Sequence, residues 1–151
     1  MKQVNDSVFG IMEYNYAWEK TDVISAFGRD FEVKVVAEAN DNQDIIDVQR
    51  KAYSTYLNNF TRYMISIPDV LLDYYKTNYN SISSNVNIPE RININNINKE
   101  LIVKLIKIRS VYFSRKGTYG WLCECAWEPE HGIAIVLSTE SPLITEQDYL
   151  I

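Results

Sequence analysis

The sequence is poor in the residue types that most often build catalytic sites. It contains one histidine, His131, two cysteines, five glycines and four prolines among 151 residues. Histidine is the one side chain whose unperturbed pKa lies near neutral pH, so a chain with a single copy has few ways to assemble acid–base or metal chemistry. The nucleophile-elbow, P-loop, zinc-protease and glycine-rich dinucleotide motifs are also absent. These absences favour a binding role over catalysis.

Long hydrophobic runs are missing as well. No segment approaches the ~20 apolar residues that a membrane span requires. The first twenty residues hold Asp6, Glu13 and Glu19 and lack the basic start and apolar run of a secretory signal. We therefore expect a cytoplasmic protein that does not bind membranes. The length fits one domain over residues 1–151, and no repeat or linker divides the chain.

The two cysteines are separated by one residue, Glu124. On a strand Cys123 and Cys125 project from the same face, and a disulfide between them would close a very tight, strained loop. We expect buried, reduced thiols, which is typical of a reducing compartment. Redox sensing and metal binding are the alternatives, but the familiar zinc sites need ligands that one histidine does not complete. The sequence predicts no metal and no cofactor.

Positive charge is absent from the C-terminal part of the chain. The net charge is −5, which disfavours nucleic acid as a partner. Residues 91–116 contain seven Lys and Arg against one acid, Glu100, whereas the segment from Gly117 onward contains no Lys or Arg. Its acids are Glu124, Glu128, Glu130, Glu140, Glu146 and Asp148. Either the two segments pair in one sheet and neutralise each other, or the acids form a face for a basic partner.

The N-terminal third has the pattern of antiparallel strands. We expect strands over residues 7–14, 22–27 and 30–38. Apolar and polar residues alternate most clearly in the third, where Phe31, Val33 and Val35 are the apolar positions. Gly28-Arg29 fits a two-residue hairpin turn with glycine first. The aromatic residues Tyr14, Tyr16 and Trp18 alternate at the end of the first strand. Such a cluster either covers the core edge or serves as an interface hot spot, and Trp18 is the candidate partner-binding residue.

The central part has helical periodicity. Apolar residues recur at spacings of three and four from Ile45 to Tyr74, which predicts one helical face packed on the core. The aromatic members of this stripe are also suited to stacking on a ligand, but core packing is the preferred interpretation. Asn58-Asn59 is a candidate break between two helices. Pro68 predicts a kink or a helix end, since proline lacks an amide hydrogen.

Residues 77–98 read as a long connection rich in Asn, Ser and Ile, with Pro89 near its middle. Loops of this length are usually mobile or functional. Alternatively, its isoleucines hold it on the core: Ile88, Ile92, Ile94 and Ile97. Asn98 resembles an N-cap for a short helix over 99–106. Strands are expected over 108–113, 121–127 and 133–137, with a closing edge from 143–144 and 149–151. The sequence thus predicts an α+β fold in which N-terminal and C-terminal antiparallel strands form one sheet packed on a central helical pair.

The candidate site is the turn Trp127-Glu-Pro-Glu-His-Gly132. Glu128, Glu130 and His131 lie together there, and Asp148 approaches if the last segment folds back. A carboxylate beside an imidazole fixes its tautomer, which supports general acid–base catalysis but also simply stabilises a hairpin. The enzyme alternative is a small hydrolase or metal-dependent enzyme built on His131, Glu130, Glu128 and Asp148. The preferred interpretation is a partner-binding surface formed by Glu128, Glu130, His131, Glu146 and Asp148.

These motifs resemble a bacterial family of small domains of unknown function. The resemblance is carried by Phe9-Gly10, the segment from Tyr14 to Trp18, Phe27-Gly28, Gln49, Ala52-Tyr53, the turn from Trp127 to Gly132, and Gln147-Asp148. The family lacks assigned catalysis, and small acidic domains of this kind are similar to immunity or accessory proteins of toxin systems. The resemblance implies a non-enzymatic domain that binds a protein partner, for instance a basic toxin domain. Homo-oligomerisation through an exposed strand edge is a further alternative.

Overall fold

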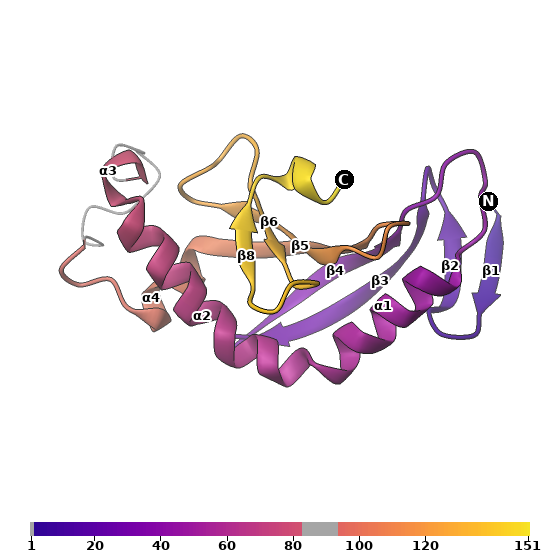
Figure 1. The fold of residues 1–151 in the computed structure, drawn as a ribbon, viewed down its shortest axis with the longest axis horizontal. Helices are drawn as coiled ribbons and strands as arrows, with labels where there is room; N and C mark the ends of the chain where they lie inside the picture. The colour runs from indigo at the N-terminus through magenta and orange to yellow at the C-terminus, as the bar shows by residue number, and fades with distance from the viewer. Residues whose placement is uncertain (1, 83–93) are drawn as a thin grey trace.

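A computed structural model describes residues 2–82 and 94–151 and shows a sheet with two helices along one face (Figure 1). The strands are β1 Gln3–Asp6, β2 Gly10–Tyr14, β3 Trp18–Ala26, β4 Arg29–Ala37, β5 Ile106–Phe113, β6 Tyr119–Cys125, β7 Ile133–Val136 and β8 Leu143–Thr145. The helices are α1 Asp47–Asn58, α2 Phe60–Thr77, α3 Tyr79–Ile82 and α4 Lys99–Ile102, with short 3₁₀ turns η1 Val103–Leu105 and η2 Gln147–Tyr149. In the described ranges no helix is long and apolar enough to cross a membrane.

The strands follow one another across the sheet in chain order, from β1 to β8. All neighbours are antiparallel except β4 and β5, which run parallel with Val35 opposite Val111. A parallel pair requires a crossover connection, and α1 and α2 lie in that crossover. The predicted α+β fold, one sheet packed on a central helical pair, is confirmed.

The N-terminal strands differ in detail from the prediction. The hairpin between β3 and β4 turns at Phe27-Gly28, not at Gly28-Arg29, and Ala26 pairs with Arg29. Both turn residues have positive φ, 57° at Phe27 and 74° at Gly28, as in the mirror-image turns that match strand twist. Residues 7–14 do not form one strand as expected. Strand β2 begins at Gly10, and a turn separates it from β1.

The predicted break at Asn58-Asn59 is present, whereas the helix end considered at Pro68 is not. Helix α1 ends and α2 begins around Asn59, whose φ of −105° and ψ of 7° are outside the helical region, so the break there is confirmed. Pro68 lies inside α2 and does not end it. Ile67 and Leu71 on either side are fully buried. Their packing offsets the hydrogen bond that proline removes.

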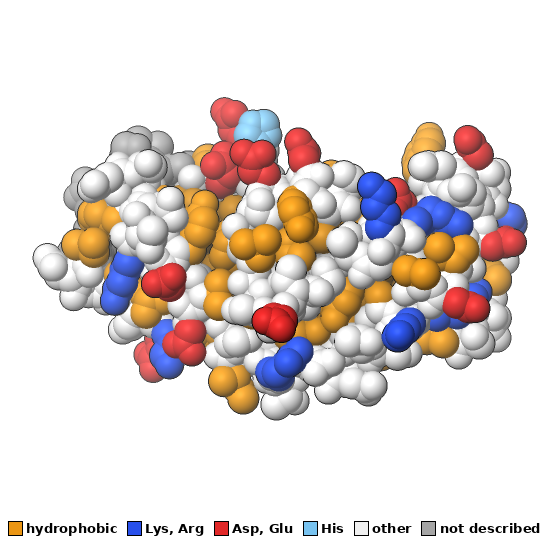
Figure 2. Space-filling view, in the orientation of Figure 1, with side chains coloured by type: hydrophobic (Ala, Val, Ile, Leu, Met, Phe, Trp, Pro, Cys, Tyr) orange, Lys and Arg blue, Asp and Glu red, His pale blue; other side chains and the backbone are white. Residues whose placement is uncertain are grey.

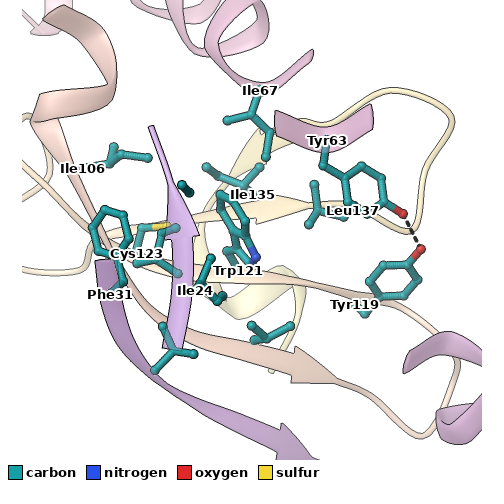
Figure 3. Close-up of a cluster of buried hydrophobic side chains, with 14 of the residues drawn as sticks. Ile24, Phe31, Tyr63, Ile67, Ile106, Tyr119, Trp121, Cys123, Ile135 and Leu137 are labelled. Carbon is teal, nitrogen blue, oxygen red and sulfur yellow. Dashed lines mark hydrogen bonds between the residues drawn. The ribbon is translucent and has the colours of Figure 1, made fainter. Parts of the chain in front are cut away.

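The core fills the space between the helices and the sheet. Trp121 and Ile135 of the sheet and Ile67 of α2 are fully buried (Figure 3). The hydroxyl groups of Tyr63 and Tyr119 lie 2.7 Å apart across this interface. Among the aromatic residues of the predicted stripe, Tyr56 and Tyr63 are both 3% exposed, and Phe60 and Tyr74 are partly buried against the same core, so the core-packing interpretation is confirmed.

The connection after α2 is only partly described. Ile97 is buried and packs on the core, in agreement with the interpretation that the isoleucines hold the connection there. Ile94 does not follow it and is 42% exposed. Ile88, Pro89 and Ile92 lie outside the described residues. The N-cap prediction is confirmed, because Asn98 Oδ1 accepts the Leu101 amide at 2.9 Å. The helix is shorter than expected, and η1 completes it.

The last segment is not a strand. Residues 147–149 form η2, and Leu150 donates its amide to the Gln147 carbonyl at 2.9 Å. Leu150 is buried against Ala134 and Val136 of β7. The predicted edge strand over 149–151 is therefore wrong, because a compact turn lets Leu150 cover these apolar side chains. The edge over 143–144 is confirmed as β8.

A fully buried amide side chain, that of Gln49, joins α1 to the sheet. Its Nε2 donates to the carbonyl of Glu38 at 2.9 Å and to that of Phe113 at 3.2 Å, at the ends of β4 and β5. Its Oε1 accepts the Ile46 amide at 3.1 Å at the start of α1. One side chain thus fixes the helix start against the parallel strand pair.

An acidic group, Asp6, holds the turn between β1 and β2. Its carboxylate accepts the amides of Val8 and Phe9, both at 3.0 Å, and the Arg50 Nε at 2.8 Å. Burial alone would raise the pKa of Asp6, but the hydrogen bonds from Phe9, Val8 and Arg50 outweigh it and lower the pKa below its usual value. These amide bonds turn the chain where the sequence pattern suggested a continuous strand.

Replacing Gln49 tests the link between helix and sheet. Gln49→Met keeps the volume but leaves the two carbonyls and the Ile46 amide without this partner, so we expect a loss of about 3 kcal/mol in unfolding free energy. Urea unfolding measures the loss. The control is Gln3→Met at an exposed position, where a change of at most about 0.5 kcal/mol is expected. Equal losses in the two variants would contradict the role of Gln49 as the link between α1 and the sheet.

The Asp6 contacts predict a pH dependence. Because the pKa of Asp6 is lowered in the folded state, its contribution is present above the unfolded pKa of about 3.9 and is lost as the pH falls through the folded value. Asp6→Asn should cost about 2 kcal/mol at pH 7, and the difference from wild type should shrink below about pH 4. Unfolding at several pH values measures this. Asp47→Asn, at a 97% exposed partner of Arg50, is the control and should change little.

Candidate functional site

The turn between β6 and β7 carries the conspicuous Trp-Glu-Pro-Glu-His-Gly motif. Trp127 is 6% exposed, and its ring lies 5.5 Å from that of Tyr75 in an edge-on contact. The Glu128 amide donates to the Cys125 carbonyl at 3.1 Å, and the Gly132 amide donates to the Glu128 carbonyl at 2.8 Å. The tryptophan therefore anchors a tight loop in the core, and the loop presents its polar residues to solvent.

The C-terminal segment folds back onto this loop. Gln147 Nε2 donates to the Cys123 carbonyl at 3.4 Å, which attaches η2 to β6. Gly132 has a φ of +62°, and a Cβ placed there would lie 2.2 Å from the Cys123 carbonyl oxygen and 2.7 Å from Gln147 Nε2. Only glycine allows this close approach. Gly132 thus allows the loop after β6 and the C-terminal segment to pack closely against each other.

Together the two segments surround a hollow of about 460 Å³. Its charged lining residues are Glu128, Glu130 and His131 from the loop and Glu146 and Asp148 from the C-terminal segment. We name the four carboxylates and the imidazole the acidic rim. Figure 2 shows acidic side chains gathered around the single histidine at the top of the molecule. The structure brings together all the predicted site residues except Trp18.

In the described part of the basic segment, no residue neutralises the charge of the rim. Arg109 of β5 pairs with Glu124 of β6 at 2.7 Å, and the hydrogen bond from Arg109 lowers the pKa of Glu124. Within the described ranges no Lys or Arg forms an ion pair with the four rim carboxylates. The interpretation of neutralisation within the sheet therefore applies to Glu124, whereas the rim carboxylates form a separate acidic surface without Lys or Arg ion pairs in the described structure.

The histidine of the rim is held loosely. His131 is 81% exposed on its side chain, and its Nε2 lies 3.9 Å from Glu130 Oε2, which is long for a hydrogen bond. No group of three His, Cys, Asp or Glu in the described part of the chain lies in a metal-binding arrangement. The enzyme alternative based on His131, Glu130, Glu128 and Asp148 gains no specific support from this geometry.

Trp18 lies elsewhere and is 1% exposed. Its Nε1 donates to the Gln43 carbonyl at 2.7 Å, and its ring contacts Tyr14 edge-on. Trp18 therefore covers the core edge, which was one of the two interpretations, and its burial contradicts its choice as a partner-binding residue. The cysteines are free and buried as predicted, and burial raises the pKa of Cys125 to about 12.

Two other residues that line the hollow, Gln147 and Gly132, had no predicted role. Gln147 was noted only as part of a motif, and nothing in the sequence indicated that its amide reaches β6. Gly132 carried a usable signal, since a glycine that ends a turn commonly adopts positive φ. Its close approach to Cys123 and Gln147, however, depends on a contact between segments that are distant along the chain.

Replacing Gly132 tests how the rim is built. Gly132→Ala combines left-handed strain with a backbone clash, so we expect a loss of about 3 kcal/mol in unfolding free energy and shifted amide resonances at Gln147. The control is Gly28→Ala, where φ is +74° but the Cβ meets open space, so only about 1 kcal/mol should be lost. Urea unfolding and NMR spectra measure both. Similar losses in the two variants contradict the close approach.

Comparison with known proteins assigns the chain to a family. The family model for the domain of unknown function DUF6985 matches residues 8–149. No curated protein and no solved structure matches the chain. The matched range includes the β3–β4 hairpin, both long helices and the whole rim, and it agrees with the expectation of a domain of unknown function. The chain therefore belongs to the DUF6985 family of domains of unknown function.

Proposed function

We propose that this domain is a non-enzymatic protein-binding module whose acidic rim contacts a basic surface of its partner. The observation that carries the proposal is the convergence of Glu128, Glu130, Glu146 and Asp148 from two distant segments around one hollow. Four carboxylates that lack Lys or Arg partners in the described structure repel one another. A cationic partner would relieve that repulsion.

The charge distribution favours a protein partner with a positive face. From Gly117 onward the chain contains no Lys or Arg, so this surface has one sign of charge. Complementary fields speed association and disfavour wrong partners more than they add affinity. The rim rests on a tight loop anchored by the buried Trp127, which gives a preformed surface at little cost in ordering.

The partner class that fits best is a basic toxin domain, with this chain as its immunity or accessory protein. Such a protein has to bind fast and tightly and needs no chemistry of its own, which agrees with a sequence that lacks catalytic motifs. The toxin role rests on similarity of class, and the acidic rim supports only the charge of the partner. The site of action we propose is the cytoplasm.

Charge reversal tests the proposal. Toxin domains encoded beside the gene for this chain are co-expressed with it, and growth rescue and the dissociation constant are measured. The triple variant Glu128→Lys, Glu130→Lys, Glu146→Lys should weaken binding at least tenfold, roughly 1.4 kcal/mol, and abolish rescue, because it repels a basic face. Wild-type binding should weaken as salt is added.

The matched control changes the net charge equally at exposed acids outside the rim: Glu32→Lys, Asp73→Lys, Glu100→Lys. It should change the dissociation constant less than threefold. Full rescue by the rim variant contradicts the rim as the binding surface. The absence of a stoichiometric complex with every neighbouring toxin contradicts the immunity role.

A further inference from the structure

Strand β3 continues well beyond the end of its pairing with β2. Strand β2 pairs with β3 at only two positions, Glu13 with Glu19 and Tyr14 with Trp18. On its other side β3 pairs with β4 along its whole length to Ala26. Figure 1 shows β1 and β2 turned away at one end of the molecule while β3 runs on along the sheet. From Thr21 to Ser25, β3 therefore has a neighbouring strand on one side only in the described structure.

One hydrogen bond shows in which direction the backbone groups of this segment point. The Val23 amide donates to the carboxylate of Asp22 at 2.8 Å, so it points away from β4. In an antiparallel pair the direction alternates from residue to residue, so the amides and carbonyls of Thr21 and Ser25 point outward as well. A row of outward amide and carbonyl groups is a template for another strand.

An apolar hollow of about 250 Å³ lies beside this edge. Ile24 and Val35 of the sheet line one wall, and Tyr56, Leu57 and Phe60 at the junction of α1 and α2 line the other. Leu57 is 52% exposed although it is apolar. Asp22 is the charged residue among the lining residues that the structure describes. The hollow thus offers space for one apolar side chain next to one carboxylate.

We propose that the β3 edge binds an extended segment of another protein by strand addition, and that this segment carries an apolar residue followed two positions later by Lys or Arg. Alternate side chains of an added strand point to the same face of the sheet. In the antiparallel orientation the apolar side chain lies opposite Ile24 and enters the hollow, and the basic side chain lies opposite Asp22. Backbone hydrogen bonds supply affinity, and the two side chains supply specificity.

The Asp22 carboxylate has a different role before and after binding. In the free protein it accepts the Val23 amide and so shields that donor from other strands. An incoming carbonyl takes over the Val23 amide, and the carboxylate then pairs with the cation of the ligand. A ligand without that cation leaves the Asp22 carboxylate partly desolvated beside an apolar hollow, and no opposite charge compensates this cost.

A second copy of this chain fits the edge less well. Two β3 edges paired antiparallel over the whole segment from Thr21 to Ser25 place each Asp22 opposite Ile24 of the second copy. Each carboxylate then faces an apolar side chain and no cation, which is unfavourable. Charge complementarity therefore favours a partner with the apolar-x-basic pattern.

Two synthetic peptides test the proposal with the full chain. The probes are acetyl-Ser-Thr-Val-Thr-Lys-Thr-Ser-amide and the same peptide with Glu in place of Lys, titrated into ¹⁵N-labelled protein. The Lys peptide should slow hydrogen exchange of the Thr21, Val23 and Ser25 amides at least tenfold at saturation, and it should bind at least tenfold more tightly than the Glu peptide. Asp22→Lys should reverse this preference. Glu32→Lys, an equal charge change on the opposite face of β4, should preserve it.

A backbone variant separates strand addition from other kinds of binding. Val23→Pro removes an amide hydrogen that β4 does not use, and proline is tolerated on edge strands, so the fold should persist while peptide binding falls at least tenfold. Val23→Ala keeps the amide and should bind the peptide like wild type within threefold.

Three results overturn the proposal. They are unchanged exchange at Thr21, Val23 and Ser25 with saturating peptide, equal binding of the two peptides, and self-association that protects these same amides without peptide. The last result assigns the edge to a second copy. The rim variant at Glu128, Glu130 and Glu146 should bind the Lys peptide normally, so this site stands or falls independently of the proposed function.

Discussion

The amide of Gln49 is the constraint on which the arrangement of the molecule depends. The β4–β5 pair is the only parallel contact in the described sheet, and it is the contact that joins the N-terminal strands to the C-terminal strands. Gln49 bonds to the last carbonyls of this pair and to the first turn of α1 at the same time. It therefore sets where the helices cross the sheet. Loss of a partner at such a buried group costs more than its bonds contribute.

The two proposed binding surfaces follow from how the helices cover the sheet. Helices α1 and α2 change direction at Asn59, and the hollow beside β3 lies at that junction. The acidic rim lies instead at the loop after β6 and at η2, where Leu150 covers the other apolar cluster of the sheet. The rim depends on side-chain charge, whereas the β3 edge depends on backbone groups and one apolar hollow. The two surfaces are therefore suited to different partners.

Local patterns predicted the parts of the fold that local physics determines. Alternation at Phe31, Val33 and Val35 identified β4, and the spacing of apolar residues identified both helices, because each pattern reflects burial of one face. Strand β1 was missed because three of its four residues are exposed, which leaves no alternation. The last segment was misread because η2 depends on Leu150 finding a partner in β7. The sequence also grouped the rim acids but left Trp18 open between the core edge and an interface, since periodicity does not tell which face of a strand is covered.

The order of the strands has a consequence for how the chain folds. Strands β1 to β4 and β5 to β8 are two meanders in which each strand pairs with its neighbour in sequence, so each forms from contacts that close short loops. The pairing of Val35 with Val111 instead closes a loop that contains α1, α2 and the connection after them. Long loops carry the larger entropic cost, and non-local pairing slows folding. We therefore expect the joining of the two meanders at β4 and β5 to be the slow step of folding, and the hydrogen bonds of Gln49 to both strands require that step.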